Sequence, residues 1–208
     1  MSTKEPFGTL REHLPTLRAA LDDLERQADV VEALGAELAG VFAAGGRLLV
    51  AGNGGSAAEA QHLTAELVGR FEGERRPLSA LCLHAETSSV TAIANDYGYD
   101  DVFARQVLAH GRPGDVLLLL TTSGRSRNLL RAAEAAHGAR LRVWALTGPV
   151  PNPLASVCDV TVGIGSGSTS AIQEAHLVVV HALCSAVERN LGPVRLELDL
   201  DRLPAEVG

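Results

Sequence analysis

Residues 47–71 of this 208-residue chain read RLLVAGNGGSAAEAQHLTAELVGRF. The apolar run at 48–51 is short and ends at a glycine, which is typical of a buried strand in an α/β protein. Helical spacing then continues for about four turns. Between the two lies the glycine loop, residues 52–55, where Gly54 and Gly55 let the backbone reach positive φ and leave free N–H groups at a helix N-terminus. The stretch predicts a strand, a turn that can bind an anion, and a helix.

Two features of the predicted helix have more than one interpretation. Ser56 and Glu59 have the S-x-x-E spacing of a capping box, so Ser56 could serve only to start the helix. His62 and Glu66 lie four residues apart and therefore project from one face. An imidazole beside a carboxylate is usually a surface pair, so the meaning of this pair depends on what faces it in the fold.

Strand-like runs recur along the chain at 78–83, 116–120, 141–146 and 159–164, and helical patterns separate most of them. Five strands alternating with helices predict an α/β protein with a three-layer, doubly wound, parallel sheet and right-handed crossovers. Ligands of such sheets bind at the carboxyl ends of the strands. After a short helix at 87–94, Asn95 and Asp96 precede a tyrosine and a glycine, and these four residues predict a turn.

The strand at 116–120 leads into the hydroxyl loop, residues 121–126, which read TTSGRS. Its four hydroxyl groups belong to Thr121, Thr122, Ser123 and Ser126. Together with a helix N-terminus they can satisfy the oxygen atoms of a phosphate. The alternative is that Ser123 or Ser126 only caps the helix at 128–137, but capping needs one hydroxyl rather than four. We therefore favour phosphate binding.

The last informative stretch is 168–181, which reads STSAIQEAHLVVVH. Ser170 and Gln173 have the S-x-x-Q spacing of a capping box, so Gln173 could be only a capping partner. His181 lies two helical turns after Gln173 in an apolar run. A histidine in a buried helix is by default a hydrogen-bonded core residue. Here the alternative is that His181 meets His62 and Glu66.

Composition excludes several classes of function. Hydrophobic residues make up 46% of the chain, enough for one domain with an extension. The net charge of −7 disfavours nonspecific nucleic-acid binding, and the sequence has no run of eighteen uncharged apolar residues that would predict a membrane span. Three cysteines without CxxC spacing fit a reducing compartment. We expect a cytoplasmic protein without a nucleic-acid or membrane partner. Lys4 is the only lysine, so arginine, hydroxyl and backbone N–H groups must hold any phosphate.

An N-terminal helical arm precedes the first strand. Its leucines and other apolar residues follow an alternating 4-3 spacing from Leu10 to Leu38, and Pro15 marks a kink or a late helix start. This apolar helix face either covers the protein's own sheet or pairs with another subunit, and its length favours the second alternative. We therefore divide the chain into an oligomerisation arm (1–44), a phosphosugar-binding domain (45–192) and a C-terminal tail (193–208).

These motifs, in this order, resemble the sugar isomerase (SIS) fold and, within it, the phosphoheptose isomerase family. The resemblance spans roughly residues 10 to 190 and rests on the GNGGS run at 52–56, QHLTAELVGRF at 61–71, AND at 94–96, TSGRS at 122–126 and IQEAH at 172–176. It implies a homotetramer with its N-terminal helices bundled at the centre and active sites shared between subunits.

The resemblance also implies a reaction and residue roles. The family converts D-sedoheptulose 7-phosphate, a phosphorylated C7 sugar, into D-glycero-D-manno-heptose 7-phosphate through an enediol. Glu66 matches its general base and His181 its general acid. The positions that match its substrate contacts are Asn53, Gly54, Gly55, Ser56, Glu66, Arg70, Asn95, Asp96, Thr121, Thr122, Ser123, Ser126 and Gln173.

Some members of the family bind Zn²⁺, one ion per subunit, through the positions matched here by His62, Glu66, Gln173 and His181. The chain departs from the family just before Gln173, where Ser170 and Ala171 replace an acidic or hydroxyl residue and an arginine. Two other classes compete with the isomerase. One is a catalytically silent SIS scaffold similar to the tetramers that associate with replication initiators, which lack the base at Glu66. The other is a sugar-sensing domain of a transcription regulator. Retention of both Glu66 and His181 favours the enzyme.

Overall fold

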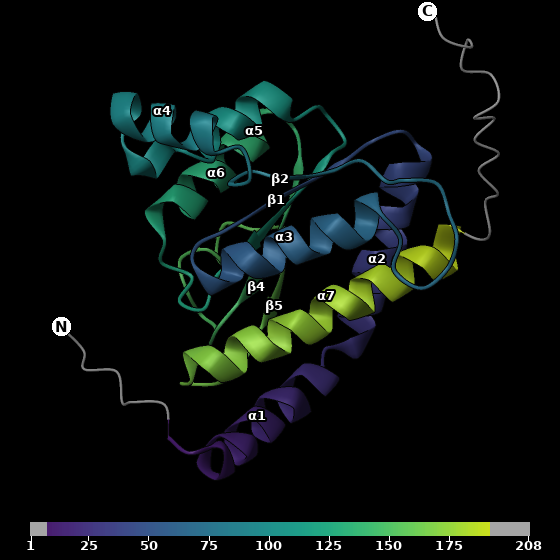
Figure 1. Ribbon diagram of the computed structural model, residues 1–208, viewed down its shortest axis with the longest axis vertical. Helices are drawn as coiled ribbons and strands as arrows, with labels where there is room; N and C mark the ends of the chain where they lie inside the picture. Colours follow the sequence, from purple (N-terminus) through teal and green to yellow (C-terminus); the bar gives the residue numbers. More distant parts are fainter. Residues whose placement is uncertain (1–7, 192–208) are drawn as a thin grey trace, which may run out of the picture.

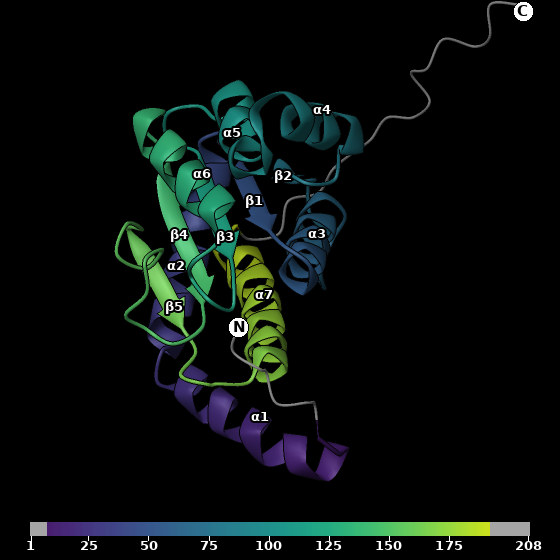
Figure 2. The same cartoon turned by 90° about the vertical axis from the view of Figure 1, so that its left-hand side faces the viewer.

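Five strands form one parallel sheet in the order β2-β1-β3-β4-β5 (Figure 1, Figure 2). The structure is a computed structural model and describes residues 8–191. In register, Leu48 of β1 pairs with Val116 of β3, which in turn pairs with Arg142 of β4. The predicted doubly wound parallel sheet is confirmed. The strands are β1 (Leu48–Gly52), β2 (Ala80–Cys82), β3 (Val116–Leu120), β4 (Arg142–Thr147) and β5 (Val160–Gly163).

The helices lie close to their predicted positions, with one correction. Asn95 and Asp96 do not form a turn, because they belong to the last turn of α4. The carboxylate of Glu86 caps the start of α4, and Gly98, at φ 91°, ends it. The helices are α1 (Leu10–Glu25), α2 (Ala28–Ala43), α3 (Gly55–Val68), α4 (Thr87–Tyr97), α5 (Ala104–His110), α6 (Arg127–Gly138) and α7 (Thr169–Leu191), with a 3-10 turn, η1, at Tyr99–Asp101.

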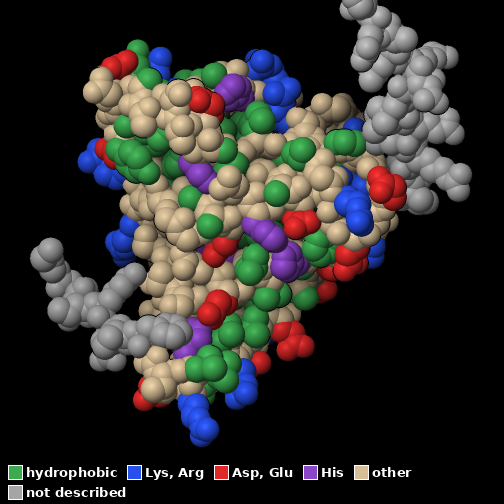
Figure 3. Space-filling model, viewed as in Figure 1, with side chains coloured by type: hydrophobic (Ala, Val, Ile, Leu, Met, Phe, Trp, Pro, Cys, Tyr) green, Lys and Arg blue, Asp and Glu red, His purple; other side chains and the backbone are tan. Residues whose placement is uncertain are grey.

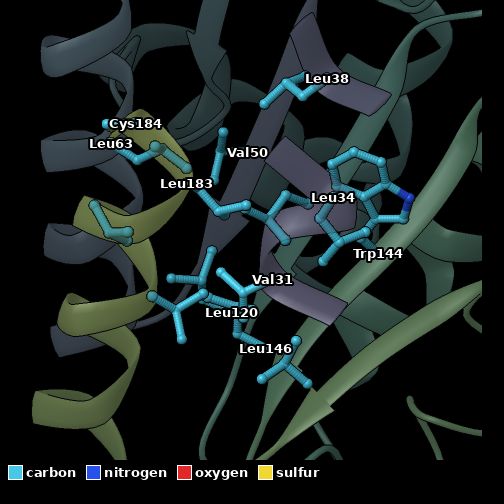
Figure 4. Packing of buried hydrophobic residues seen from close by; sticks show 14 of the residues in the cluster. Val31, Leu34, Leu38, Val50, Leu63, Leu120, Trp144, Leu146, Leu183 and Cys184 are labelled. Carbon is cyan, nitrogen blue, oxygen red and sulfur yellow. The ribbon is translucent and has the colours of Figure 1, made fainter. Parts of the chain in front are cut away.

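Helices cover both faces of the sheet. Successive strand residues point to opposite sides, so the apolar strands place hydrophobic side chains on both faces. Leu49 and Leu117 belong to the hydrophobic core under α5 and α6. Val50 and Trp144 belong to a second core, against α2, α3 and α7 (Figure 4). Figure 2 shows these two helical layers on either side of the strands. The long apolar strands of the sequence are therefore buried from both sides.

The N-terminal arm divides into two parts. In α2, Leu34 and Leu38 are buried in the core of the sheet, so this helix covers the protein's own sheet. In α1, Leu10 is 66% exposed, and the helix extends away from the sheet (Figure 1). Pro15 lies inside α1, and the chain breaks instead at Gln27, whose side-chain amide donates to the carbonyl of Gly163 and accepts from its N–H. The predicted tail, 193–208, lies outside the described residues.

Helix α7 is the longest helix of the described chain and lies in the middle of the second core. By length and hydropathy alone it could cross a membrane, but 56% of its most apolar window is buried within the molecule. Val179 and Leu183 are fully buried among residues of the other core helices. Its apolar character is therefore that of a core helix.

Candidate active site

Helices α3 and α7 lie side by side and are parallel, so residue numbers increase in the same direction along both helices. We call the line of polar groups between them the α3–α7 seam. Histidine and acidic side chains gather over these two helices in the middle of the face seen in Figure 3. The seam consists of three successive contacts, Gly55 with Gln173, Glu59 with His176, and His62 with His181.

The predicted acid and base meet through a third residue. Nε2 of His62 lies 3.0 Å from Nε2 of His181 and 3.5 Å from Oε1 of Glu66. These three residues form the helix cluster. The ring of Phe71 lies 5.6 Å from that of His181, centroid to centroid. His181 is half-buried rather than a core residue, and His62 is exposed, so the helix cluster is open to a ligand.

A buried ion pair fixes the turn that follows α3. Nε of Arg75 lies 3.1 Å from the carboxylate of Glu188, which also accepts from the N–H groups of Phe71 and Gly73. The guanidinium of Arg75 donates to the carbonyl groups of Glu66 and Leu67. These are terminal carbonyls of α3, which have no partner within the helix. The pair therefore positions both the end of α3 and the ring of Phe71.

The glycine loop is shaped by backbone conformation and close packing. Gly54 has φ 59°, which favours glycine, and is the N-cap of α3. A Cβ atom on Gly55 would lie 2.3 Å from Nε2 of Gln173. Neither predicted capping box exists: α3 begins at Gly55, which places Ser56 inside the helix, and α7 begins at Thr169, which places Ser170 inside as well.

An amide pair joins the glycine loop to the hydroxyl loop. Asn53 donates to Oδ1 of Asn128 at 3.1 Å and accepts from Nδ2 of Asn128 at 2.9 Å. The hydroxyl of Tyr99 also donates to Oδ1 of Asn53. Asn128 is buried in the first turn of α6, two residues after Ser126. Sequence reasoning missed Asn128 and Tyr99, because a pairing of two remote amides leaves no periodic signal.

The hydroxyl groups of the hydroxyl loop have different roles. Oγ1 of Thr121 accepts from the N–H groups of Ser123 and Gly124 and thus holds the loop in shape. Ser126 is the N-cap residue of α6, but its side chain makes no capping hydrogen bond. Oγ of Ser123 accepts from the N–H of Arg125. The capping alternative is therefore wrong for Ser126. Thr122, half-buried, follows Thr121 at the end of β3.

The proline-rich segment that follows β4 packs against the hydroxyl loop. Asn152, which is buried, donates to Oγ1 of Thr147 and accepts from the N–H of Ala155. A Cβ atom on Gly124 would lie 2.0 Å from Oδ1 of Asn152, so only glycine fits there without a shift. Gly124 also has φ 62°. This close approach is a second contribution that the sequence pattern did not reveal.

One chain places the predicted site residues in two separate groups. The glycine and hydroxyl loops lie at the carboxyl ends of β1 and β3, and Gln173 lies beside Gly55. Glu66 follows Gly55 by eleven residues on one helix, or about 16 Å at the α-helical rise. We call the two groups the loop half and the helix half of the site.

The remaining predicted residues lie at the edges of these halves. Arg70 follows α3 and is exposed, with its guanidinium donating to the carbonyl of Glu72. Asn95 and Asp96 are exposed, and the amide of Asn95 donates to the carboxylate of Asp96 at 2.8 Å. Three residues after Asp96, the hydroxyl of Tyr99 contacts Asn53 of the glycine loop.

The four predicted zinc ligands do not come together in one chain. Two imidazoles and a carboxylate suit zinc by donor chemistry, and the helix cluster provides them. Gln173, however, precedes His181 by eight residues on α7, or about 12 Å along the helix. Among residues 8–191, no group of three or more His, Cys, Asp or Glu side chains is arranged to hold a metal ion.

Comparisons with known proteins identify what this arrangement is similar to. A family model described as the SIS domain matches residues 12–148. A phosphoheptose isomerase of Streptomyces coelicolor is 59% identical over 179 residues, which cover 86% of this chain and 78% of the relative. One of Rhodospirillum rubrum is 49% identical over 175 residues, covering 82% and 93%.

Solved structures agree with the sequence relatives. The phosphoheptose isomerase of Francisella tularensis superposes with a TM-score of 0.79 at 35% identity, covering 88% of this chain and all of that one. The phosphoheptose isomerase of Neisseria gonorrhoeae gives a TM-score of 0.79 at 37% identity, covering 86% and 96%. Both therefore share the five-stranded parallel architecture described above.

Proposed function

The chain belongs to the SIS-domain family and, within it, to the phosphoheptose isomerases, and we propose that it converts D-sedoheptulose 7-phosphate into D-glycero-D-manno-heptose 7-phosphate. It is a phosphosugar isomerase by this membership. The observation that carries the specific proposal is the convergence of Glu66, His62 and His181 from two helices. A scaffold without activity has no physical need for a carboxylate and two imidazoles in contact on an open surface.

The isomerisation moves a carbonyl group from C2 to C1 and needs two kinds of proton transfer. Glu66 acts as the base that removes a proton from C1, which gives an enediol, and returns a proton to C2. His181 moves protons between the oxygens at C1 and C2, for which an imidazole is well suited near neutral pH. His62 lies within 3.5 Å of both partners and orients them. No atom is gained or lost overall.

The loop half binds the phosphate in this proposal. Ser126 offers a free hydroxyl at the N-terminus of α6, where the helix dipole favours an anion. Thr121 keeps the loop N–H groups in place, and Asn128 ties the loop to Asn53. Binding energy from the phosphate then fixes the reacting carbons, although the phosphate itself takes no part in the reaction.

The two halves of one complete site come from different subunits in this proposal. Within one chain, α3 sets Glu66 about 16 Å from Gly55 along the helix, which favours two subunits contributing to one site. The exposed Leu10 and Leu14 of α1 give an apolar surface for assembly. We therefore keep the homotetramer with shared sites, which the family resemblance implied, as part of the proposed function.

A zinc ion is proposed only for the assembled enzyme. The donors that the chain offers are His62, Glu66 and His181, which are not arranged around a metal ion in the described chain, and Gln173 lies about 12 Å from His181 along α7. When bound, zinc would supply Lewis-acid polarisation of the carbonyl or a structural clamp. The roles of Glu66 as a ligand and as a base exclude each other at any one moment.

The purified protein, incubated with sedoheptulose 7-phosphate, tests the proposal directly. We expect aldose formation, measured by an aldose-specific derivatisation, and no activity on the unphosphorylated ketose. The same assay after treatment with a chelator, and after adding back Zn²⁺, tests the metal. Turnover of other ketose phosphates at equal rates, with none of the C7 sugar, would contradict the proposed substrate.

A further inference from the structure

Glu59 and His176 face each other in the middle of the α3–α7 seam. Oε2 of Glu59 lies 3.9 Å from Nδ1 of His176. The side chain of Glu59 is 11% exposed and that of His176 is fully buried. Neither facing atom has a hydrogen-bond partner in the described structure. Buried polar atoms without a partner are rare in folded proteins, so this pair requires an explanation.

The contact of the second ring nitrogen of His176, Nε2, shows which nitrogen of the neutral ring carries the hydrogen. Nε2 lies 3.1 Å from the carbonyl oxygen of Thr147, which can only accept, so Nε2 carries the hydrogen. In a neutral ring Nδ1 is then an acceptor, and an ionised Glu59 is also an acceptor only. Two acceptors that face each other away from water are unfavourable, and one proton between them removes the conflict.

We propose that Glu59, as a neutral carboxylic acid, donates its proton to Nδ1 of His176, and that this buried pair positions the helix cluster. The observed separation is about 1 Å longer than a hydrogen bond, and the broad terminal torsion of a glutamate can close it. No oxidant or co-reactant is involved, since one proton is shared between two groups of the same chain.

Burial supports the neutral form of both partners. Burial raises the pKa of Glu59 to about 8 and lowers that of His176 to about 4. The carbonyl of Thr147 faces His176 from β4, and the next contact along the seam joins His62 on α3 with His181 on α7. An ion pair here would be costly, because no further donors satisfy the carboxylate.

The pair joins three elements next to the helix cluster. Glu59 precedes His62 by three residues on α3, and His176 precedes His181 by five on α7. Through Thr147 the pair also reaches the end of β4. Glu59 and His176 are thus positioning residues, which set α3 against α7 without touching the sugar. Only this catalytic consequence rests on the proposed function.

Selective ¹⁵N labelling of histidine in the full chain tests the proton directly. We expect the His176 ring at pH 7 to be neutral, with hydrogen on Nε2 and a hydrogen-bonded Nδ1, and to stay neutral from pH 5 to 8. The variant His176→Gln identifies the signal. An imidazolium at pH 7 would mean an ion pair and would overturn the neutral pair. This measurement needs no substrate, so it stands even if the proposed reaction is wrong.

Kinetics of two substitutions test positioning. Glu59→Leu removes the donor, and we expect kcat to fall about 10- to 100-fold with a smaller change in KM, the effect of a misplaced catalytic group. Glu59→Gln keeps an N–H donor for Nδ1 and should restore most of the loss. Glu134→Leu, on the exposed face of α6, is the matched control and should retain the original kcat. An unchanged kcat in Glu59→Leu, or no rescue by glutamine, would overturn the positioning role.

Discussion

Nε2 of His62 on α3 lies 3.0 Å from Nε2 of His181 on α7, so two residues from opposite ends of the domain share one hydrogen bond. One ring must donate and the other accept if both are neutral. Oε1 of Glu66 lies 3.5 Å from the same nitrogen of His62, so this atom lies between the predicted base and the predicted acid. Substitutions within the helix cluster should therefore have effects on kcat that are not additive.

Substitution of either predicted catalytic residue should abolish most turnover. We expect Glu66→Gln and His181→Asn each to lower kcat by about 10²- to 10⁴-fold, the usual contribution of a general acid or base. The double variant should be little worse than the slower single variant, because the two groups act as a unit. Steady-state kinetics measures this, with the exposed Glu74→Gln as the control. Additive losses would show that the two residues act independently.

Two hydroxyl groups of the hydroxyl loop should respond oppositely to removal. Ser126→Ala should raise KM about tenfold by loss of a charge-assisted bond to the phosphate, with the melting temperature unchanged. Thr121→Val should instead lower the free energy of unfolding by about 1 kcal/mol, since two loop N–H groups lose their acceptor. Calorimetry and kinetics on both variants separate the effects. A fall in stability with unchanged KM for Ser126→Ala would restore capping as its role.

Mixing two variants that are each impaired in one half should raise activity if the halves of a site come from different subunits. One variant is Glu66→Gln, in the helix half, and the other is Ser123→Ala with Ser126→Ala, in the loop half. After subunit exchange we expect up to about a quarter of full activity, since random mixing forms about one site in four from two intact halves. Mixing Glu66→Gln with His181→Asn is the control, because both belong to the helix half. Equal recovery in both mixtures, or in neither, contradicts shared sites.

The buried pair of Arg75 and Glu188 should matter more for stability than exposed ion pairs. Arg75 is 4% exposed, so Arg75→Leu leaves the carboxylate of Glu188 without its partner and should cost about 3–5 kcal/mol of unfolding free energy. Arg131→Leu, which breaks an exposed pair with Asp101, is the control and should leave stability unchanged. Urea unfolding measures both. Similar midpoints for the two variants would argue against the clamp on α3.

Stability should depend on pH through Glu59. Its folded pKa, about 8, exceeds the ordinary value of 4.5, so the folded state retains a proton that the unfolded state loses. The free energy of unfolding should therefore fall by about 1.4 kcal/mol per pH unit over this window. His176 has the opposite effect from about pH 4 to 6.5, so the two effects cancel between about pH 4.5 and 6.5 and the net fall runs from about pH 6.5 to 8.

Glu59→Gln provides the comparison for this pH dependence. Without a titrating carboxyl, the variant should show no fall between pH 6.5 and 8 and should retain only the rise that His176 causes at lower pH. Urea unfolding of both proteins across this range is the measurement. Parallel pH profiles for the original chain and the variant would show that Glu59 does not hold the proton.

Much of the architecture was predictable because it depends on local patterns. Apolar runs such as 116–120 and the alternation of strands with helices predict a parallel sheet, and glycine at 54 predicts a turn with positive φ. The turn predicted at Asn95 was wrong, because the cap at Glu86 and the stop at Gly98 extend α4 through it. Turn propensity is weak beside a well-capped helix.

The sequence by itself determined the sheet and the positions of the glycine and hydroxyl loops, since each is a property of a contiguous stretch, and it predicted Glu66 as the base and His181 as the acid. Only the tertiary structure decided which stretches meet: His62 with His181, Asn53 with Asn128, Arg75 with Glu188, and Glu59 with His176. These contacts arise from the way α3 and α7 pack on one sheet face, where side chains remote in sequence become neighbours. Periodicity carries no information about such pairs, because it describes one element at a time.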